Sequence, residues 1–147
     1  MSSNGLVAQV PSQQCVDEWT KEWLSFTLEI LNRHRRDFDK MAMRIRPIYD
    51  IERQFADIVR EVFADGKTSW SRVMTVMAFA IHLQSRFNID LKTTTAALLE
   101  EIVFSRLMDN QSDIVDMLPS GVDYWLPVDI TSLLHNFVVC ILTNAFA

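Results

Sequence analysis

The chain has 147 residues, of which 49% are hydrophobic and 22% charged, and its net charge is −5. This length suits one domain with a continuous core, and this composition excludes a disordered chain. The excess of acids disfavours a nucleic-acid partner, because the densest basic cluster (Arg33, Arg35 and Arg36) lies beside Asp37 and Asp39 and indicates a solvated helix face.

Glycine and proline are scarce, with three and four residues, which favours long helices over many short strands. The seven methionines suit a surface that repacks around different ligands. Residues 1–14 are polar and rich in small side chains, so we expect a flexible N-terminal arm followed by a single domain over residues 15–147. The two cysteines, with no secretory signal at the start, fit a reducing, cytoplasmic compartment.

The first half of the domain shows three helical patterns. Apolar residues at i, i+4 and i+7 spacing predict a helix over 15–32. A second helix is predicted over 34–46, with Phe38, Met41 and Ile45 on one side, and Pro47 should end or kink it. A third is predicted over 51–63, and Gly66 suits the left-handed position past its end.

The segment 73–83 is the most informative, because only Thr75 and His82 in it are not apolar. A helix that is hydrophobic almost all round belongs at the centre of a soluble domain. Asn88 and Asp90 end this pattern, and further helices are predicted over 91–108 and 112–118. The sequence therefore predicts an all-α fold of seven to eight helices around a central hydrophobic helix.

The C-terminal segment 133–147 is apolar but contains His135, Asn136 and Asn144. It falls short of the roughly 20 apolar residues that a membrane-spanning helix requires. We therefore expect no stable membrane span. The last helix should run from residue 129 or 130 to 143, capped by Asp129 or Thr131, and should pack in the core.

The sequence offers little for catalysis. The three histidines lie on three different predicted helices, without the spacing of helical metal sites, and His82 is best interpreted as a core residue. Three scattered glycines cannot form a phosphate-binding loop. The adjacent Glu100 and Glu101 point about 100° apart on a helix, so they do not face one substrate. We expect no enzyme activity, no metal and no cofactor.

One segment, residues 55–79, reads FADIVREVFADGKTSWSRVMTVMAF and resembles the first homology region of the Bcl (B-cell lymphoma two) family. Residues 63–66 match its Phe-x-Asp-Gly motif. Residues 69–72, Ser-Trp-Ser-Arg, correspond to the family's Asn-Trp-Gly-Arg motif, which begins the central helix, and they follow the first motif with one residue more than in the family. Residues 22–28 resemble the family's N-terminal homology region, and the agreement in order covers roughly residues 17–108.

The resemblance implies a hydrophobic groove over the central helix, which binds the amphipathic helix of a partner. In the family, an arginine at the groove edge pairs with an aspartate of that helix, and Arg72 occupies its position. The other residues that fall at groove positions are Ser69, Ser71, Ile58, Val62, Met41, Ile45, Ile48, Tyr49, Met74, Thr75 and Phe79. Plain core packing is the competing interpretation for each of these except Arg72.

Several residues depart from the family pattern. Ser71 replaces a glycine that lets the ligand backbone approach, which should narrow the choice of ligands. Ser69 replaces an asparagine that bonds the ligand. Within 34–46, Asp39 fits the aspartate of the family's own death motif, but Phe38 and His34 replace its glycine and leucine. This degraded motif argues against the chain acting as a ligand itself.

The short link between the first two helices and the missing tail anchor resemble virus-encoded survival factors more than cellular members. The resemblance implies an anti-apoptotic function, in which the protein captures the helices of pro-death proteins. We expect it in the cytoplasm, which would be that of a host cell if the protein is viral, and at the mitochondrial surface through its partners. Two alternatives are a pore-forming pro-death member and a helical signalling adaptor with a closed groove. A methionine-rich exposed groove would also support a homodimer.

Overall fold

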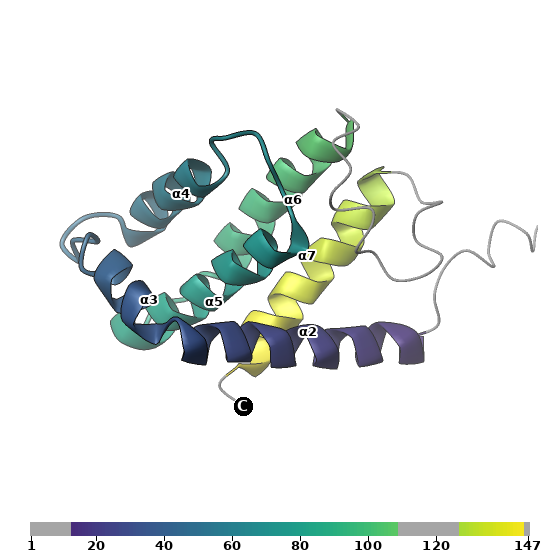
Figure 1. The fold of residues 1–147 in the computed structure, drawn as a ribbon, viewed down its shortest axis with the longest axis horizontal. Helices are drawn as coiled ribbons and strands as arrows, with labels where there is room; N and C mark the ends of the chain where they lie inside the picture. The colour runs from purple at the N-terminus through teal and green to yellow at the C-terminus, as the bar shows by residue number, and fades with distance from the viewer. Residues whose placement is uncertain (1–12, 109–126, 146–147) are drawn as a thin grey trace, which may run out of the picture.

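The computed structural model describes residues 13–108 and 127–145, which form six helices and no strand (Figure 1). They are α2 (Gln13–Arg33), α3 (Arg35–Ala42), α4 (Ile51–Val62), α5 (Trp70–Phe87), α6 (Lys92–Met108) and α7 (Pro127–Asn144). The predicted all-α fold is confirmed. The helix expected over 112–118 lies outside the described residues, and α2 begins inside the segment predicted to be an arm, at Gln13.

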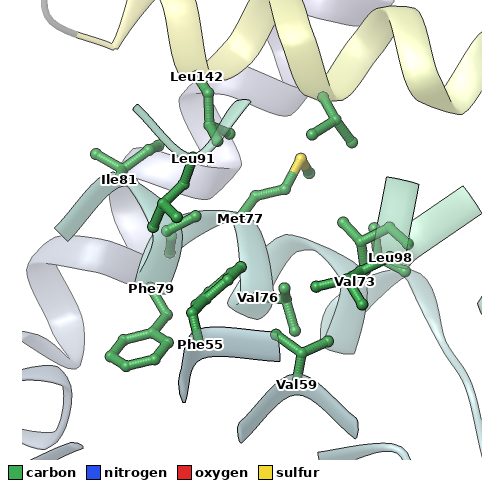
Figure 2. Close-up of a cluster of buried hydrophobic side chains, with 14 of the residues drawn as sticks. Phe55, Val59, Val73, Val76, Met77, Phe79, Ile81, Leu91, Leu98 and Leu142 are labelled. Carbon is green, nitrogen blue, oxygen red and sulfur yellow. The ribbon is translucent and has the colours of Figure 1, made fainter. Parts of the chain in front are cut away.

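Helix α5 is the central helix, as its composition predicts. It contacts all the other described helices, and Val73, Met77 and Leu83 on it are completely buried. Figure 2 shows Met77 between Leu142 of α7 on one side and Val59 of α4 on the other. A helix with little polar surface is stable here because its neighbours cover most of it.

An aromatic cluster joins α5 to the first and last helices. The ring of Trp23 on α2 lies 4.7 Å from that of Trp70 on α5 and 4.5 Å from that of Phe137 on α7. Trp70 and Phe137 are buried. Such ring pairs add about 0.5–1.5 kcal/mol each beyond their buried area, so this cluster fixes where α5 begins relative to α2 and α7.

The ends of the helices next to α5 follow from local side chains. Asp50 caps α4 by accepting a hydrogen bond from the N–H of Arg53 at 3.3 Å, and Ser69 caps α5 in the same way from Arg72 at 3.3 Å. Gly66 has φ +82°, which confirms the left-handed turn predicted after the third helix. Asn88, with φ +53°, ends α5 where the pattern predicts.

The predicted end of the second helix is wrong, because α3 ends at Ala42 rather than at Arg46. The N–H groups of residues 44 and 45 donate to carbonyls only three residues earlier, which tightens the chain into a turn. The side-chain amide of Gln54 then donates to the carbonyl of Arg46 at 3.0 Å and accepts from its N–H at 2.9 Å. The helix therefore ends at Ala42, before Pro47, and a contact with α4 holds the chain that follows it.

The C-terminal helix packs in the core, as expected, with Leu134, Phe137 and Ile141 buried. It begins at Pro127, so Asp129 and Thr131 lie inside the helix and the predicted cap is wrong. Proline suits this first position because its missing N–H would have no helical partner. Over the ranges that the structure describes, no helix combines the length and apolar character needed to cross a membrane.

Candidate functional site

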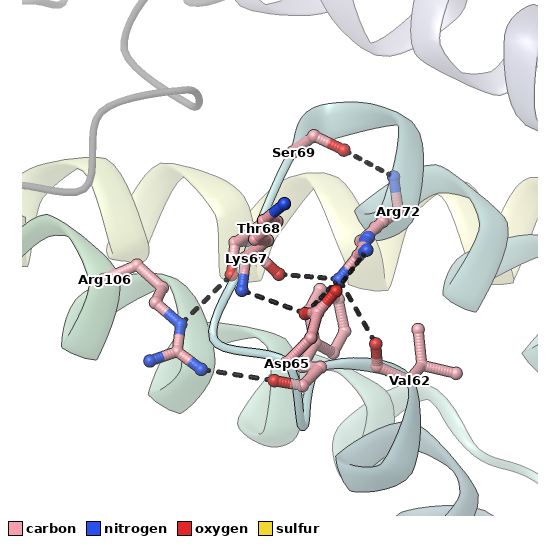
Figure 3. A network of polar contacts seen from close by, with 8 residues as sticks. Val62, Asp65, Lys67, Thr68, Ser69, Arg72 and Arg106 are labelled. Atoms are coloured by element: carbon pink, nitrogen blue, oxygen red, sulfur yellow. Dashed lines mark hydrogen bonds and ion pairs between the residues drawn. The ribbon is translucent and has the colours of Figure 1, made fainter.

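Arg72, in the first turn of α5, is the centre of a polar network between α4 and α5 (Figure 3). Its Nη1 and Nη2 atoms donate to the two carboxylate oxygens of Asp65 at 2.7 and 2.8 Å. Nη1 also donates to the carbonyl of Lys67 at 2.9 Å, with the carbonyl of Val62 at 3.3 Å. About one third of the Arg72 side chain is exposed to solvent. The residue predicted to meet a ligand therefore already holds a carboxylate of its own chain.

The network keeps both of its charged partners ionised. The hydrogen bonds from Arg72 hold the pKa of Asp65 well below its ordinary value, and the backbone N–H of Lys67, 3.0 Å from the carboxylate, lowers it further. The Asp65 carboxylate in turn raises the pKa of Arg72. The pair is thus fully charged across the physiological pH range.

A second arginine holds the same loop from another helix. Arg106 of α6 donates from Nε to the hydroxyl of Thr68 at 3.3 Å and from Nη2 to the carbonyl of Phe63 at 3.2 Å. Figure 3 shows Arg72 and Arg106 approaching the loop from opposite sides. Arg106 was not among the predicted site residues, because it lies far from the motif in sequence and no local pattern indicates its position.

The predicted site residues divide into three groups by exposure. Ile45, Ile58 and Phe79 are buried, and Ser71, Ile48 and Tyr49 are exposed. The half-buried residues are Arg72, Ser69, Val62, Met41, Met74 and Thr75. Core packing therefore accounts for the first group, whereas the other two groups lie where a ligand could touch them.

Two hydroxyl groups predicted at the site serve the helix itself. Ser69 caps α5, and Thr75 donates to the carbonyl of Ser71 at 2.8 Å. Serine in place of asparagine at residue 69 is thus sufficient to start α5. Ser71 has its side chain exposed at the position where the family has glycine.

The connection between α3 and α4, residues 43–50, exposes three large apolar side chains. Met43, Ile48 and Tyr49 are 73%, 84% and 59% exposed. The connection is held to α4 by the Gln54 amide and by an ion pair of 3.5 Å between Arg44 and Glu61. Two of these three residues, Ile48 and Tyr49, are among the predicted groove residues.

The carboxylate of Asp39 is also engaged within the chain. It lies 3.6 Å from Nη1 of Arg86, which attracts α3 to α5, and 2.9 Å from Nε2 of His82, without the alignment of a hydrogen bond. The His82 side chain is 11% exposed, in keeping with a core histidine. The ring of Phe38 stacks on that of Phe79 at 5.9 Å and adds an apolar contact between the same two helices.

Two open pockets in the described part of the chain lie away from these residues. One, of about 450 Å³, lies where α5 and α7 end and is lined by Gln84, Asn88 and Leu142 among others. The second, of about 600 Å³, lies between α4 and α6. Neither is lined by a predicted groove residue. In residues 13–108 and 127–145 there is no group of three His, Cys, Asp or Glu side chains able to hold a metal ion.

Comparison with known proteins gives one match. The family model for apoptosis regulator proteins of the Bcl-2 family matches residues 24–118, which is well over half of the chain and runs from α2 past the end of α6. Neither a curated protein nor a solved structure matches. The matched range contains the Asp65–Arg72 network and the exposed connection between α3 and α4. The chain therefore belongs to the Bcl-2 family of apoptosis regulator proteins.

Proposed function

We propose that this protein is an anti-apoptotic member of the family, which sequesters the amphipathic helix of a pro-death partner. Family membership supports a role in the regulation of apoptosis, and proteins of this family act in the cytoplasm and at mitochondria. The observation that carries the proposal is the one-third exposed guanidinium of Arg72, next to half-buried Val62. An amphipathic helix offers the matching chemistry: apolar side chains at i, i+4 and i+7 and one carboxylate.

The engagement of α3 supports a role as the binding partner rather than as the ligand. To be presented to another protein, α3 would have to separate Phe38 from Phe79 and lose the ion pair between Asp39 and Arg86. Phe38 is only 2% exposed, so its release would return a large apolar surface to water.

One feature favours a narrow choice of ligand, and a second favours a likeness to virus-encoded survival factors. The exposed hydroxymethyl group of Ser71 takes up space at the rim next to Arg72, where glycine would leave room for a ligand backbone. Only His34 separates α2 from α3, so the long loop that the family pattern places between these helices is missing.

A helical adaptor without a ligand is the second candidate. The burial of Ile45, Ile58 and Phe79, together with the pairing of Arg72 to Asp65, is what a closed groove would show. The two candidates differ in one measurable property, because only the sequestering protein binds isolated death-motif helices.

The test is a titration of the purified protein with a panel of fluorescent death-motif peptides of about 26 residues, roughly seven helical turns. We expect at least one dissociation constant below about 1 µM. The Arg72→Ala variant should bind that peptide about tenfold more weakly or worse, because a charge-assisted pair is lost.

The matched control is Arg33→Ala, which removes an exposed arginine that pairs with Glu29 at 2.6 Å on α2. This variant should bind like the wild type. Absence of binding to every peptide would reject sequestration in favour of the adaptor. Leakage of dye from mitochondria-like vesicles on addition of the protein would instead indicate a pore-forming, pro-death member.

A further inference from the structure

The Arg72 guanidinium has an unused bidentate edge. It carries five N–H donors: two on Nη1, two on Nη2 and one on Nε. Asp65 takes one donor from each Nη atom, and the carbonyls of Lys67 and Val62 lie against Nη1. Among the residues that the structure describes, none accepts from Nε or from the second Nη2 hydrogen.

These two remaining donors are parallel. The Nε hydrogen and the Nη2 hydrogen on the same side of the planar group point in one direction, so they can hold both oxygens of a second carboxylate. Asp65 occupies the other edge, between Nη1 and Nη2. A ligand carboxylate therefore does not need to displace Asp65 to reach Arg72.

The charges around the network also leave room for a second carboxylate. Lys67, Arg72 and Arg106 bring three positive charges to the loop, and Asp65 brings one negative charge (Figure 3). Among these four groups the positive charges outnumber the negative one, which favours an incoming carboxylate.

Fixing Arg72 before the ligand arrives has a direct benefit for affinity. An arginine side chain free in solvent samples many rotamers and loses that freedom when it binds. The two hydrogen bonds that Arg72 donates to Asp65, and the one it donates to the carbonyl of Lys67, have already fixed the guanidinium plane. Pre-organisation of this kind strengthens binding because less entropy remains to be lost.

We propose that Asp65 is a positioning residue, which holds Arg72 so that its Nε/Nη2 edge receives the carboxylate of a partner helix while Asp65 stays bound. The inference rests on the proposed function. A simpler expectation is that Asp65 competes with the ligand for Arg72. The two ideas predict opposite changes in ligand affinity when Asp65 is removed. Removal of a competitor strengthens ligand binding, whereas removal of a positioning residue weakens it.

The test compares wild type and Asp65→Asn with the tightest-binding peptide and with the same peptide carrying Asn in place of its Asp. We expect Asp65→Asn to weaken binding of the acidic peptide about five- to tenfold and to change binding of the neutral peptide less than about twofold. A general loss of structure would weaken both peptides equally. In an Arg72→Ala background, Asp65→Asn should have no further effect on either peptide.

Asp90→Asn is the matched control. Asp90 accepts from the N–H two residues later at 2.9 Å, as Asp65 does at 3.0 Å, but lies at the opposite end of α5. It should leave both affinities unchanged. Tighter or unchanged binding of the acidic peptide by Asp65→Asn would overturn this inference alone. Failure of the wild type to bind either peptide would overturn the proposed function and the inference with it.

Discussion

Phe79 lies among the predicted groove residues, but its surroundings predict a structural role. Its side chain is 2% exposed, and its ring lies 5.9 Å from that of Phe38 on α3 and 5.9 Å from that of Phe55 on α4. The three rings thus join α3, α4 and α5. We expect Phe79→Ala to reduce the free energy of unfolding strongly, and we expect that Phe79 makes no contact with a ligand.

The magnitude follows from the buried surface. An aromatic side chain buries about 150–250 Å², which at about 25 cal/mol per Å² corresponds to roughly 4 kcal/mol or more. Measured Phe→Ala changes in cores cost about 3–5 kcal/mol, which includes the cavity left behind. Because two ring pairs are lost as well, we expect about 4 kcal/mol, a large share of the roughly 5–15 kcal/mol that stabilises a domain.

The assay is urea unfolding followed by circular dichroism at fixed temperature, with the free energy of unfolding taken from a linear extrapolation. Phe104→Ala is the control, because Phe104 on α6 is 38% exposed and its truncation should cost clearly less than that of Phe79. A loss below about 1.5 kcal/mol for Phe79→Ala, with an unchanged dependence on urea, would refute the assignment of Phe79 to the core. Phe79 would then be open to a ligand.

Two further predictions concern the loop before α5. Gly66→Ala should destabilise the protein by about 1 kcal/mol through backbone strain alone, since φ is +82° and nothing lies within 4 Å of an added Cβ. Gly66→Asn should cost less stability than Gly66→Ala. Equal urea midpoints for Gly66→Ala and the wild type would contradict this prediction. The hydrogen bonds from Arg72 are the main cause of the lowered pKa of Asp65. The ionised carboxylate therefore contributes its full stabilisation of the fold above its ordinary pKa near 4. This stabilisation decreases as the pH falls below that ordinary pKa. The melting temperature of Asp65→Asn should therefore lie below that of the wild type by a constant amount from about pH 7 to 5, and the difference should shrink steadily as the pH falls below about 4 toward the lowered native pKa. A difference that does not shrink between about pH 4 and pH 2 would rule out this pair as its source.

The parts of the fold that were predictable depend on local information. The central helix was evident because a run of apolar residues has only one suitable place in a soluble domain. Gly66 and Asn88 signalled turns because few other residues tolerate positive φ. The end of α3 was not predictable, since the Gln54 amide that holds Arg46 comes from a different helix.

The candidate site shows the same difference between features that local sequence determines and features that depend on contacts between distant segments. Arg72 was identified by its place in a motif, and Asp65 belongs to the same motif, yet the sequence offered no reason to join them. Their contact requires the turn at Gly66 to bring the end of α4 close to the start of α5. Arg106 required more, because it approaches from α6 and only the packed structure brings it to Phe63 and Thr68.

The loop between α4 and α5 therefore has two roles that constrain each other. Its backbone carbonyls at Val62 and Lys67 would be left without partners if Arg72 moved fully to a ligand, and Asp65 would lose the source of its lowered pKa. A ligand that pulled Arg72 away would thus destabilise the start of the central helix while binding to it. Use of the free Nε/Nη2 edge avoids this conflict, because the contacts that order the loop and the contact that selects the ligand fall on different edges of one guanidinium.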